Sequence, residues 1–210
     1  MVNYLKIFGI LAICILNIEF VAAQTKEFYS NGNLKSAGEF DENLKEGKWQ
    51  YYYENGQLAA VENYLNGQLH GEVLYYFPKG QLMSREFWLE DLLTDSAFHY
   101  FDDGSIEKKG MYKEGQYEGI WLFYYQGSGQ LKRKGNYSQG LPNGTWTVWD
   151  EKNLLSQKGS FKNGREDGFW QFYDNGKLRY EGNYENGKEI GIWYQYNKKG
   201  KKNVFVDYSK

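Results

Sequence analysis

The chain has 210 residues and a formal net charge of −2, so its length suits one domain and its charge excludes the basic excess typical of nucleic-acid binding. Aromatic residues make up 19% of the chain, and 25 glycines stand against 2 prolines. This mixture favours many short strands joined by glycine turns.

Residues 1–23 are predicted to be a signal peptide. An apolar run from Ile7 to Ile18 follows a short cationic start, and small residues precede Gln24. The run is shorter than the roughly 20 residues that a membrane-spanning helix needs. We therefore expect cleavage between Ala23 and Gln24 and export to the periplasm or the medium, with association to the cell envelope left open.

Two alternatives for this segment stay open. It could remain as a membrane anchor, or Cys14 could carry a lipid, although Ile13 before it is bulkier than such sites prefer. Cleavage near Ala23 would remove the only cysteine. The exported part would then have no disulfide, no thiol nucleophile and no cysteine metal ligand.

A repeat with a period of about 24 residues spans 28–196. Its first track is a turn residue, mostly glycine: Gly32, Gly56, Gly80, Gly104, Gly129, Asn153, Gly176 and Gly200. An apolar residue stands two positions later: Leu34, Leu58, Leu82, Ile106, Leu131, Leu155 and Leu178. A second glycine track is Gly47, Gly71, Gly119, Gly144, Gly168 and Gly191, followed two positions later by Trp49, Val73, Trp121, Trp146, Trp170 and Trp193. Three tracks in one register predict seven repeats and a partial eighth from Asn197.

Within each repeat the apolar positions alternate with a period of two, which predicts strands. In the segment 131–137, Leu131 and Gly135 fall on one face and the intervening lysines on the other. The Asn-Gly pairs at Asn31, Asn55 and Asn175 supply residues that tolerate positive φ in hairpin turns. We therefore predict an all-β fold: an elongated single-layer antiparallel sheet of about seven hairpins and about fourteen strands, with a partial repeat and an edge strand at 197–210.

The segment from Tyr180 to Lys201, YEGNYENGKEIGIWYQYNKKGK, resembles a MORN repeat. Two features depart from the usual repeat: the glycine of its G-x-G pair is Trp in five repeats, and its leading Tyr survives only at Tyr180. Elsewhere that Tyr is replaced by Ser36, Ala60, Ser84, Lys108, Arg133 and Gln157. The pattern is similar to the bacterial MORN-variant proteins, some of which carry an antitoxin label. The resemblance implies a string of hairpins that acts as a binding or scaffolding surface and has no catalytic residue.

Two aromatic ladders are predicted on opposite faces of this sheet. The Trp track and the Leu track are expected to form a continuous apolar ladder on one face. The second ladder is Tyr52, Tyr76, Tyr100, Tyr124, Trp149, Tyr173 and Tyr196, with the cations Lys132, Lys134 and Lys158 interleaved. One interpretation is that these rings stabilise the sheet through cross-strand contacts and are shielded from water by long polar side chains beside them. The other is that part of the ladder is a partner site, since large exposed apolar patches mark interaction surfaces.

Repeat three departs from the pattern. Asp91 takes a turn-glycine position, Asp95 the second glycine position, and His99 an aromatic position, with further carboxylates nearby in sequence. Three interpretations of these residues stay open: sequence drift or a bend in the array, a ligand or cation site, and a catalytic cluster. Their spacing fits no established metal-binding loop.

The sequence favours a non-enzymatic, exported repeat protein that binds another protein. The alternatives are an antitoxin-like protein that neutralises a partner toxin and a peripheral module that binds membrane head groups. No cofactor, metal or catalytic residue is predicted, and nucleic acid is not expected as a partner. The sequence leaves the partner and the oligomeric state open.

Overall fold

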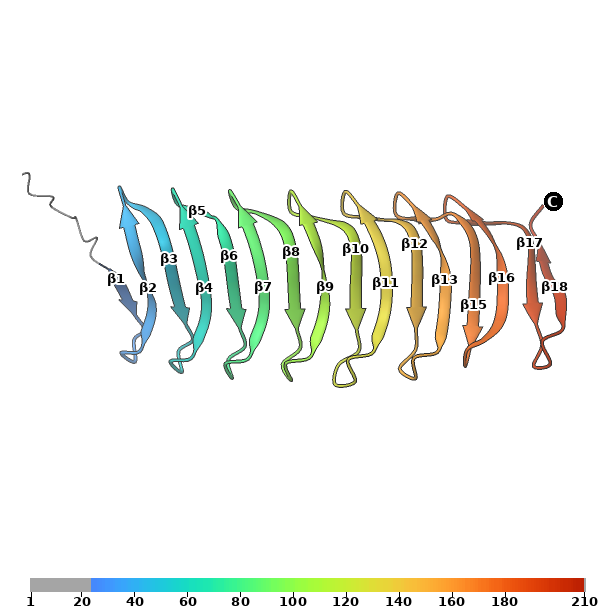
Figure 1. Ribbon diagram of the computed structural model, residues 1–210, viewed down its shortest axis with the longest axis horizontal. Helices are drawn as coiled ribbons and strands as arrows, with labels where there is room; N and C mark the ends of the chain where they lie inside the picture. The colour runs from blue at the N-terminus through green and yellow to red at the C-terminus, as the bar shows by residue number, and fades with distance from the viewer. Residues whose placement is uncertain (1–23, 210) are drawn as a thin grey trace, which may run out of the picture.

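The structure, a computed structural model, describes residues 24–209 and consists of strands and turns throughout that range. Successive strands pair antiparallel in one open sheet (Figure 1). The predicted signal peptide at 1–23, with Ala23 of the predicted cleavage site, lies outside the described residues. The strands are β1 (Thr25–Phe28), β2 (Leu34–Asp41), β3 (Leu44–Tyr52), β4 (Leu58–Leu65), β5 (Gln68–Leu69), β6 (Gly71–Tyr76), β7 (Leu82–Leu89), β8 (Leu92–Tyr100), β9 (Ile106–Lys113), β10 (Gln116–Tyr124), β11 (Leu131–Ser138), β12 (Leu141–Trp149), β13 (Leu155–Lys162), β14 (Arg165–Glu166), β15 (Gly168–Asp174), β16 (Lys177–Glu185), β17 (Lys188–Tyr196) and β18 (Lys202–Asp207).

Seven two-stranded repeats make up the sheet, which confirms the predicted fold. Repeats one to seven are β2–β3, β4–β6, β7–β8, β9–β10, β11–β12, β13–β15 and β16–β17. The 18 strands exceed the predicted fourteen because β1 and β18 add one strand at each end, and because two long strands are each divided. Gly71 and Gly168, at φ of 89° and 91°, begin β6 and β15 and separate them from β5 and β14.

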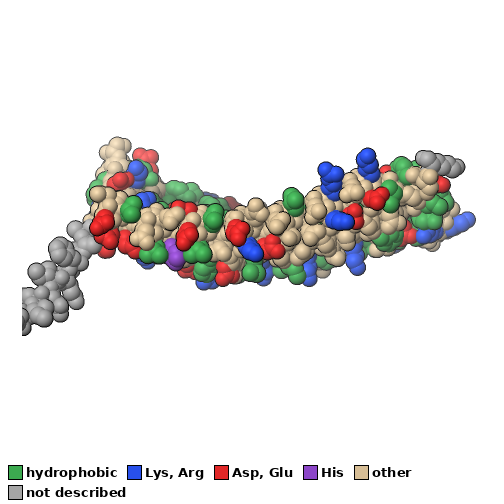
Figure 2. All heavy atoms as spheres, turned by 90° about the horizontal axis from the view of Figure 1, so that it is seen from above, with side chains coloured by type: hydrophobic (Ala, Val, Ile, Leu, Met, Phe, Trp, Pro, Cys, Tyr) green, Lys and Arg blue, Asp and Glu red, His purple; other side chains and the backbone are tan. Residues whose placement is uncertain are grey.

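The molecule is long and thin because the sheet has one layer and the strands stack side by side (Figures 1 and 2). With β5–β6 and β14–β15 each counted as one position, sixteen strand positions at about 4.8 Å apart give a length of about 72 Å. No second layer covers either face within residues 24–209. Each face must therefore protect its own apolar side chains.

One rim of the sheet, here called the NG rim, carries the turns that the Asn-Gly pairs predict (Figure 1). At residues 29–33 the N–H of Gly32 donates to the carbonyl of Tyr29 at 2.9 Å, and only the glycine has positive φ. This is a type I turn closed by a left-handed residue. Only at Asn175 and Gly176 do both residues of a pair have positive φ. The predicted role of Asn in these turns is therefore correct for Asn175 and wrong for Asn31 and Asn55.

The opposite rim carries two-residue turns in which both residues have positive φ, the geometry of primed hairpin turns. These turns lie at 42–43, 66–67, 90–91, 114–115, 139–140, 163–164 and 186–187. Their N–H groups also reach the preceding repeat: Gly67 donates to the carbonyl of Lys45 at 2.9 Å, and Gly115 to that of Leu93 at 2.8 Å. Each turn is thereby tied to its neighbour along the array.

The core of the array lies on the face that carries the Trp track, here called the Trp face. The five tryptophans are buried, and each indole lies over a glycine of the preceding strand. A Cβ atom at Gly159, for example, would overlap the ring of Trp170. Tyr and Phe rings stand edge-on between the indoles, as Phe161 does between Trp146 (5.3 Å) and Trp170 (5.1 Å), so the aromatic rings cover one another.

The Leu track does not share the Trp face, contrary to the prediction. A β-bulge next to the NG rim places one extra residue in the strand that follows the turn, such as Ala59 in β4, so that Leu58 pairs with Tyr52 and Leu155 with Trp149. Cross-strand partners lie on the same face. The leucines therefore pack beside the second aromatic ladder, and Arg133, Gly135 and Tyr137 stay on the Trp face without Leu131.

Candidate binding face

The face opposite the tryptophans, here called the Tyr face, carries the second aromatic ladder. Its members lie at or next to the end of the second strand in each repeat, three residues after the Trp position, and all are half-buried. They are Tyr52, Tyr76, Tyr100, Tyr124, Trp149, Tyr173 and Tyr196. Turn tyrosines fix the backbone beneath them: the hydroxyl of Tyr53 donates to the carbonyl of Tyr76 at 2.6 Å, and that of Tyr125 to the carbonyl of Trp149 at 2.9 Å.

Three further apolar side chains extend this face, and sequence reasoning missed them. Ile120 is 55% exposed, Phe169 50% and Ile192 40%. Each directly precedes a buried Trp in its strand, so it points to the opposite face. The alternation that places the Trp track could have revealed them. Together with Tyr124 and Tyr173 they give the C-terminal half of the Tyr face an exposed apolar character.

Two of the predicted lysines stand in one row of the Tyr face. Lys134 pairs with Thr147, and Thr147 pairs with Lys158, so the three residues lie side by side on β11, β12 and β13. Both lysines are exposed. Lys132 lies apart from this row, at the bulge near the NG rim, where its Nζ sits 5.2 Å from the ring centre of Tyr125. The structure thus brings together two of the three predicted cations.

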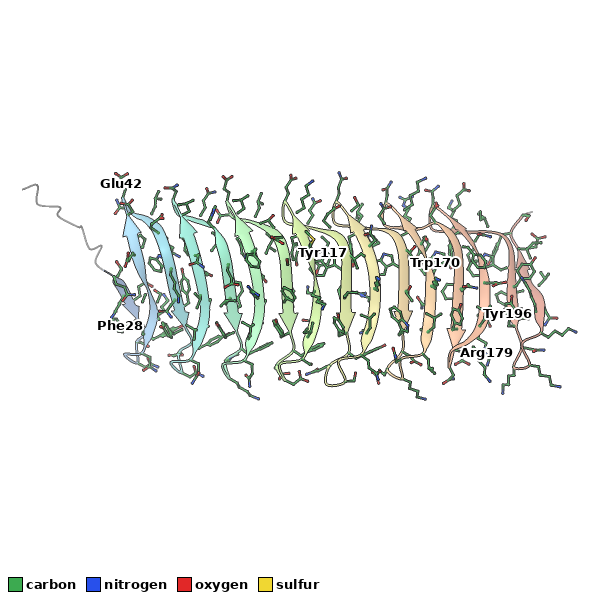
Figure 3. All side chains as sticks on the ribbon, in the orientation of Figure 1. Phe28, Glu42, Tyr117, Trp170, Arg179 and Tyr196 are labelled. Atoms are coloured by element: carbon green, nitrogen blue, oxygen red, sulfur yellow. The ribbon has the colours of Figure 1, made fainter. Side chains whose placement is uncertain are left out.

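At the C-terminal end, Tyr196 is tied into a charged cluster (Figure 3). Its hydroxyl donates to Glu181 at 2.6 Å, and Nζ of Lys202 donates to the same carboxylate at 2.7 Å. Burial opposes the charge on Glu181, but hydrogen bonds from Lys202, Tyr196 and Gln171 outweigh it and lower the pKa of that carboxyl. The hydroxyl of Tyr196 is therefore already engaged, which leaves its ring as the part available to a partner.

On the Trp face, two repeats replace the Trp–Gly pair by a small apolar residue and a glutamate, which sequence reasoning also missed. In repeats two and three the Trp position holds Val73 and Ala97, and the facing glycine position holds Glu62 and Glu86. Glu86 is 8% exposed and Glu62 is half-buried, so both acidic side chains lie largely covered on this face. Burial, and then the hydrogen bond that the hydroxyl of Tyr64 donates to Glu62 at 2.6 Å, raise the pKa of that tyrosine. Reading the two positions jointly across the repeats could have found this pair.

His99 lies within this polar part of the Trp face. Its Nδ1 is 3.9 Å from Oε1 of Glu86, and its Nε2 is buried without a hydrogen-bond partner. Burial, and then the charge of Lys108, lower the pKa of His99 to about 4. The carboxylate of Glu86 would favour the charged imidazole, but burial outweighs it. His99 is accordingly neutral at pH 7.

The carboxylates of repeat three do not gather around His99. Asp91 lies in a two-residue turn, where it accepts a hydrogen bond from the N–H of Leu69 at 2.7 Å. Asp95 adopts a left-handed φ of 56° and accepts one from the N–H of Ser96 at 2.6 Å. Asp102 and Asp103 belong to the NG rim at the other end of β8. Within residues 24–209 no group of three or more His, Cys, Asp or Glu side chains is placed to hold a metal ion.

The described part of the chain contains no helix that is long and apolar enough to cross a membrane. Two hollows open on its surface. One of about 460 Å³ lies at the NG rim beside Tyr124, Tyr125 and Lys132, where the turn at 125–130 is one residue longer than its neighbours. Another, of about 450 Å³, lies on the Tyr face between Lys134 and Lys158.

Comparisons with known proteins agree with the repeat architecture. Four stretches match the MORN repeat variant family, at residues 24–42, 45–66, 69–89 and 171–186. No curated protein matches the chain. Three of these stretches lie on strands β1 to β7 and the fourth on β15 and β16, so the match covers both ends of the array and leaves β8 to β14 unmatched.

Two solved structures show a distant likeness. The crystal structure of TcdB2-TccC3-Cdc42 is 12% identical over 86% of this chain and 14% of that chain, with a TM-score of 0.17. A protein of unknown function from Bacteroides fragilis NCTC 9343 is 10% identical over 89% of this chain and 91% of that chain, with a TM-score of 0.13. This chain thus spans 14% of the length of the first, and both TM-scores are too low to inform on the fold.

Proposed function

The chain is a MORN-repeat protein, and from this premise we propose that it is a non-enzymatic surface that binds another protein through its Tyr face. MORN repeats are generally protein- or membrane-binding modules and a non-catalytic repeat type. One observation carries the proposal: the exposed Ile120, Phe169 and Ile192 stand on the same face as the half-buried ladder. Exposed apolar side chains beside a row of aromatic rings are typical of an interaction site.

The repeat spacing gives this surface a regular form. Neighbouring ladder residues such as Tyr124 and Trp149 are two strand positions apart, about 10 Å. Aromatic rings held at fixed intervals on a rigid sheet lose little entropy on binding and act as anchors in protein interfaces. An elongated partner segment that contacts several repeats would fit this arrangement best.

Capture by crosslinking tests the proposal. The native protein is used to capture its partner from the source cells, and the affinity of that pair is then measured for Tyr124→Ala and Trp149→Ser. Each change should weaken binding about tenfold or more. Phe40→Ala is the matched control, because Phe40 packs against Trp49 on the Trp face. Equal affinities of the wild type and both Tyr-face variants would reject the proposal.

A membrane surface is the second candidate partner, favoured by Lys134 and Lys158 standing exposed near Tyr124 and Trp149. Cationic and aromatic side chains together can hold anionic head groups. Flotation with anionic vesicles at low and high salt distinguishes this candidate: salt-sensitive flotation supports it, and no flotation removes it. The antitoxin role of similar proteins would be a special case of protein binding, supported if the captured partner is a toxin.

We also propose that the protein is exported after loss of residues 1–23. The apolar run at Ile7–Ile18 and the small residues before Gln24 support this proposal. The intact mass of the native protein should correspond to a chain that begins near Gln24. A native protein that retains Met1 would contradict export with cleavage.

A further inference from the structure

We propose that the hollow between Lys134 and Lys158 on the Tyr face binds a tetrahedral oxyanion, either a phosphate monoester or a sulfate ester. The hollow has a volume of about 450 Å³ and is lined by these two lysines, by Thr145 and Thr147, and by Ile120. This inference does not depend on the proposed protein partner. It assigns a small-ligand site centred on repeat five, with Ile120 and Lys158 contributed by repeats four and six.

The hollow exists because repeat five carries Thr147 at a position where every other repeat carries a longer side chain. Thr145 and Thr147 flank the buried Trp146 and point to the Tyr face. The residues equivalent to Thr147 are Gln50, Leu74, Phe98, Leu122, Gln171 and Tyr194. In the other repeats a longer side chain thus fills the space that is open beside Thr147.

The charges around the hollow suit an anion. Lys134 and Lys158 are the direct cross-strand neighbours of Thr147 on its two sides, so both ammonium groups can reach over the threonine hydroxyls. Within residues 24–209 neither lysine forms an ion pair, whereas Arg85, which occupies the same row, is paired with Glu72. Two free ammonium groups and two hydroxyl donors match the several acceptor oxygens of a phosphate or sulfate.

The remaining walls indicate that the anion is carried on a larger group. The side-chain amide of Asn136 donates to the carbonyl of Asn143 at 2.9 Å, which fixes its orientation at the hollow. Ile120 forms an apolar wall and is 55% exposed. The volume exceeds what a single inorganic phosphate would fill. A sugar-sized or glycerol-sized carrier fits the space beside Ile120.

Titration of the protein with inorganic phosphate at constant ionic strength tests the site. Amide resonances of residues 145–147 should shift along a saturable curve, and glycerol phosphate should give the same response at lower concentration. Thr147→Leu fills the hollow with the side chain that Leu74 and Leu122 already place in this position, so the array tolerates it. We expect it, and Lys134→Gln with Lys158→Gln, to weaken binding at least tenfold.

The matched control is Lys109→Gln, a lysine of the same row that lies between Phe98 and Leu122 rather than beside a hollow. It should change the affinity less than twofold. An equal loss in Lys109→Gln, or equal shifts with chloride at the same ionic strength, would show only diffuse attraction and overturn the site. Vesicles of phosphatidylcholine with phosphatidic acid identify the source: flotation lost in Thr147→Leu supports a lipid head group, and phosphate binding without flotation supports a soluble ester.

Discussion

At the scale of single residues, the two aromatic ladders differ in what they contribute. Trp146 is 7% exposed, its Nε1 donates to the carbonyl of Asn136 at 3.1 Å, and its ring contacts Tyr137 and Phe161. Trp149, three residues later, is half-buried on the other face. The same residue type thus stabilises the sheet at one position and remains available to a partner at the other.

We predict that Trp146→Ala lowers the free energy of unfolding by about 3–5 kcal/mol, because it removes a buried ring that its neighbours cannot replace. Trp149→Ser should cost clearly less, because Trp149 is only half-buried whereas Trp146 is almost fully buried. Urea denaturation of the two variants measures both values. A Trp146 variant as stable as the wild type would show that the Trp face is not the core.

His99 makes the stability of repeat three depend on pH. Its pKa is about 4 in the fold and about 6.5 in the unfolded chain, so between these values the unfolded chain binds the extra proton. The stabilisation is complete above about pH 6.5 and is lost as the pH falls toward 4, by up to about 3 kcal/mol. His99→Phe, which restores an aromatic residue as at Phe123, should remove this dependence. Parallel melting curves of both proteins across that range would refute the assignment.

At the scale of the elements, the hairpins are held by a size match between facing positions. Five repeats pair a Trp with a glycine, and repeats two and three pair Val73 with Glu62 and Ala97 with Glu86. The combination keeps the volume on the Trp face roughly constant. An exchange at one position therefore requires the matching exchange at the other.

A double-mutant cycle tests this match. Val73→Trp alone should destabilise the protein, because the new indole meets the side chain of Glu62, and Glu62→Gly alone should leave a cavity. The double variant recreates the pair found in five repeats, and the coupling should exceed about 1 kcal/mol in its favour. Glu62→Gly combined with Ala97→Trp is the control, since these residues belong to different repeats. Additive effects in both combinations would contradict the size match.

Much of the element level could be predicted from the sequence, because a fixed period of glycines and aromatics defines hairpins and their register. The strand faces followed from alternation, and Trp146 and Tyr124 were assigned to opposite faces correctly. The Leu track was misplaced because alternation cannot reveal a β-bulge, which shifts Leu58 to pair with Tyr52. The carboxylates of repeat three were close in sequence only, since a strand of nine residues separates Asp91 from Asp102.

The candidate site was predictable in part. The ladder residues and the row of Lys134 and Lys158 followed from the repeat register. Lys132 did not join them, because its position falls on the bulge. The hollow beside Thr147 depends on the lengths of neighbouring side chains across three strands. These lengths can be compared only when the cross-strand pairs are known.

At the scale of the whole molecule, the one-layer sheet predicts an elongated particle. A sheet about 72 Å long has a radius of gyration of about 23 Å, whereas a compact chain of this length has about 17 Å. Small-angle scattering from the native protein should give the larger value. A radius near 17 Å would mean that the array folds back on itself and would bury one of the faces described above.

The most direct test of the account is hydroxyl-radical footprinting of the protein alone and bound to its captured partner. The account predicts that Trp121, Trp146 and Trp170 stay unreactive in both states, because they form the core of the array. Ile120, Trp149 and Phe169 should react in the free protein and become protected in the complex. Reactive Trp146 in the free protein, or unchanged reactivity of Trp149 on binding, would contradict the assignment of the Trp face to stability and the Tyr face to the partner.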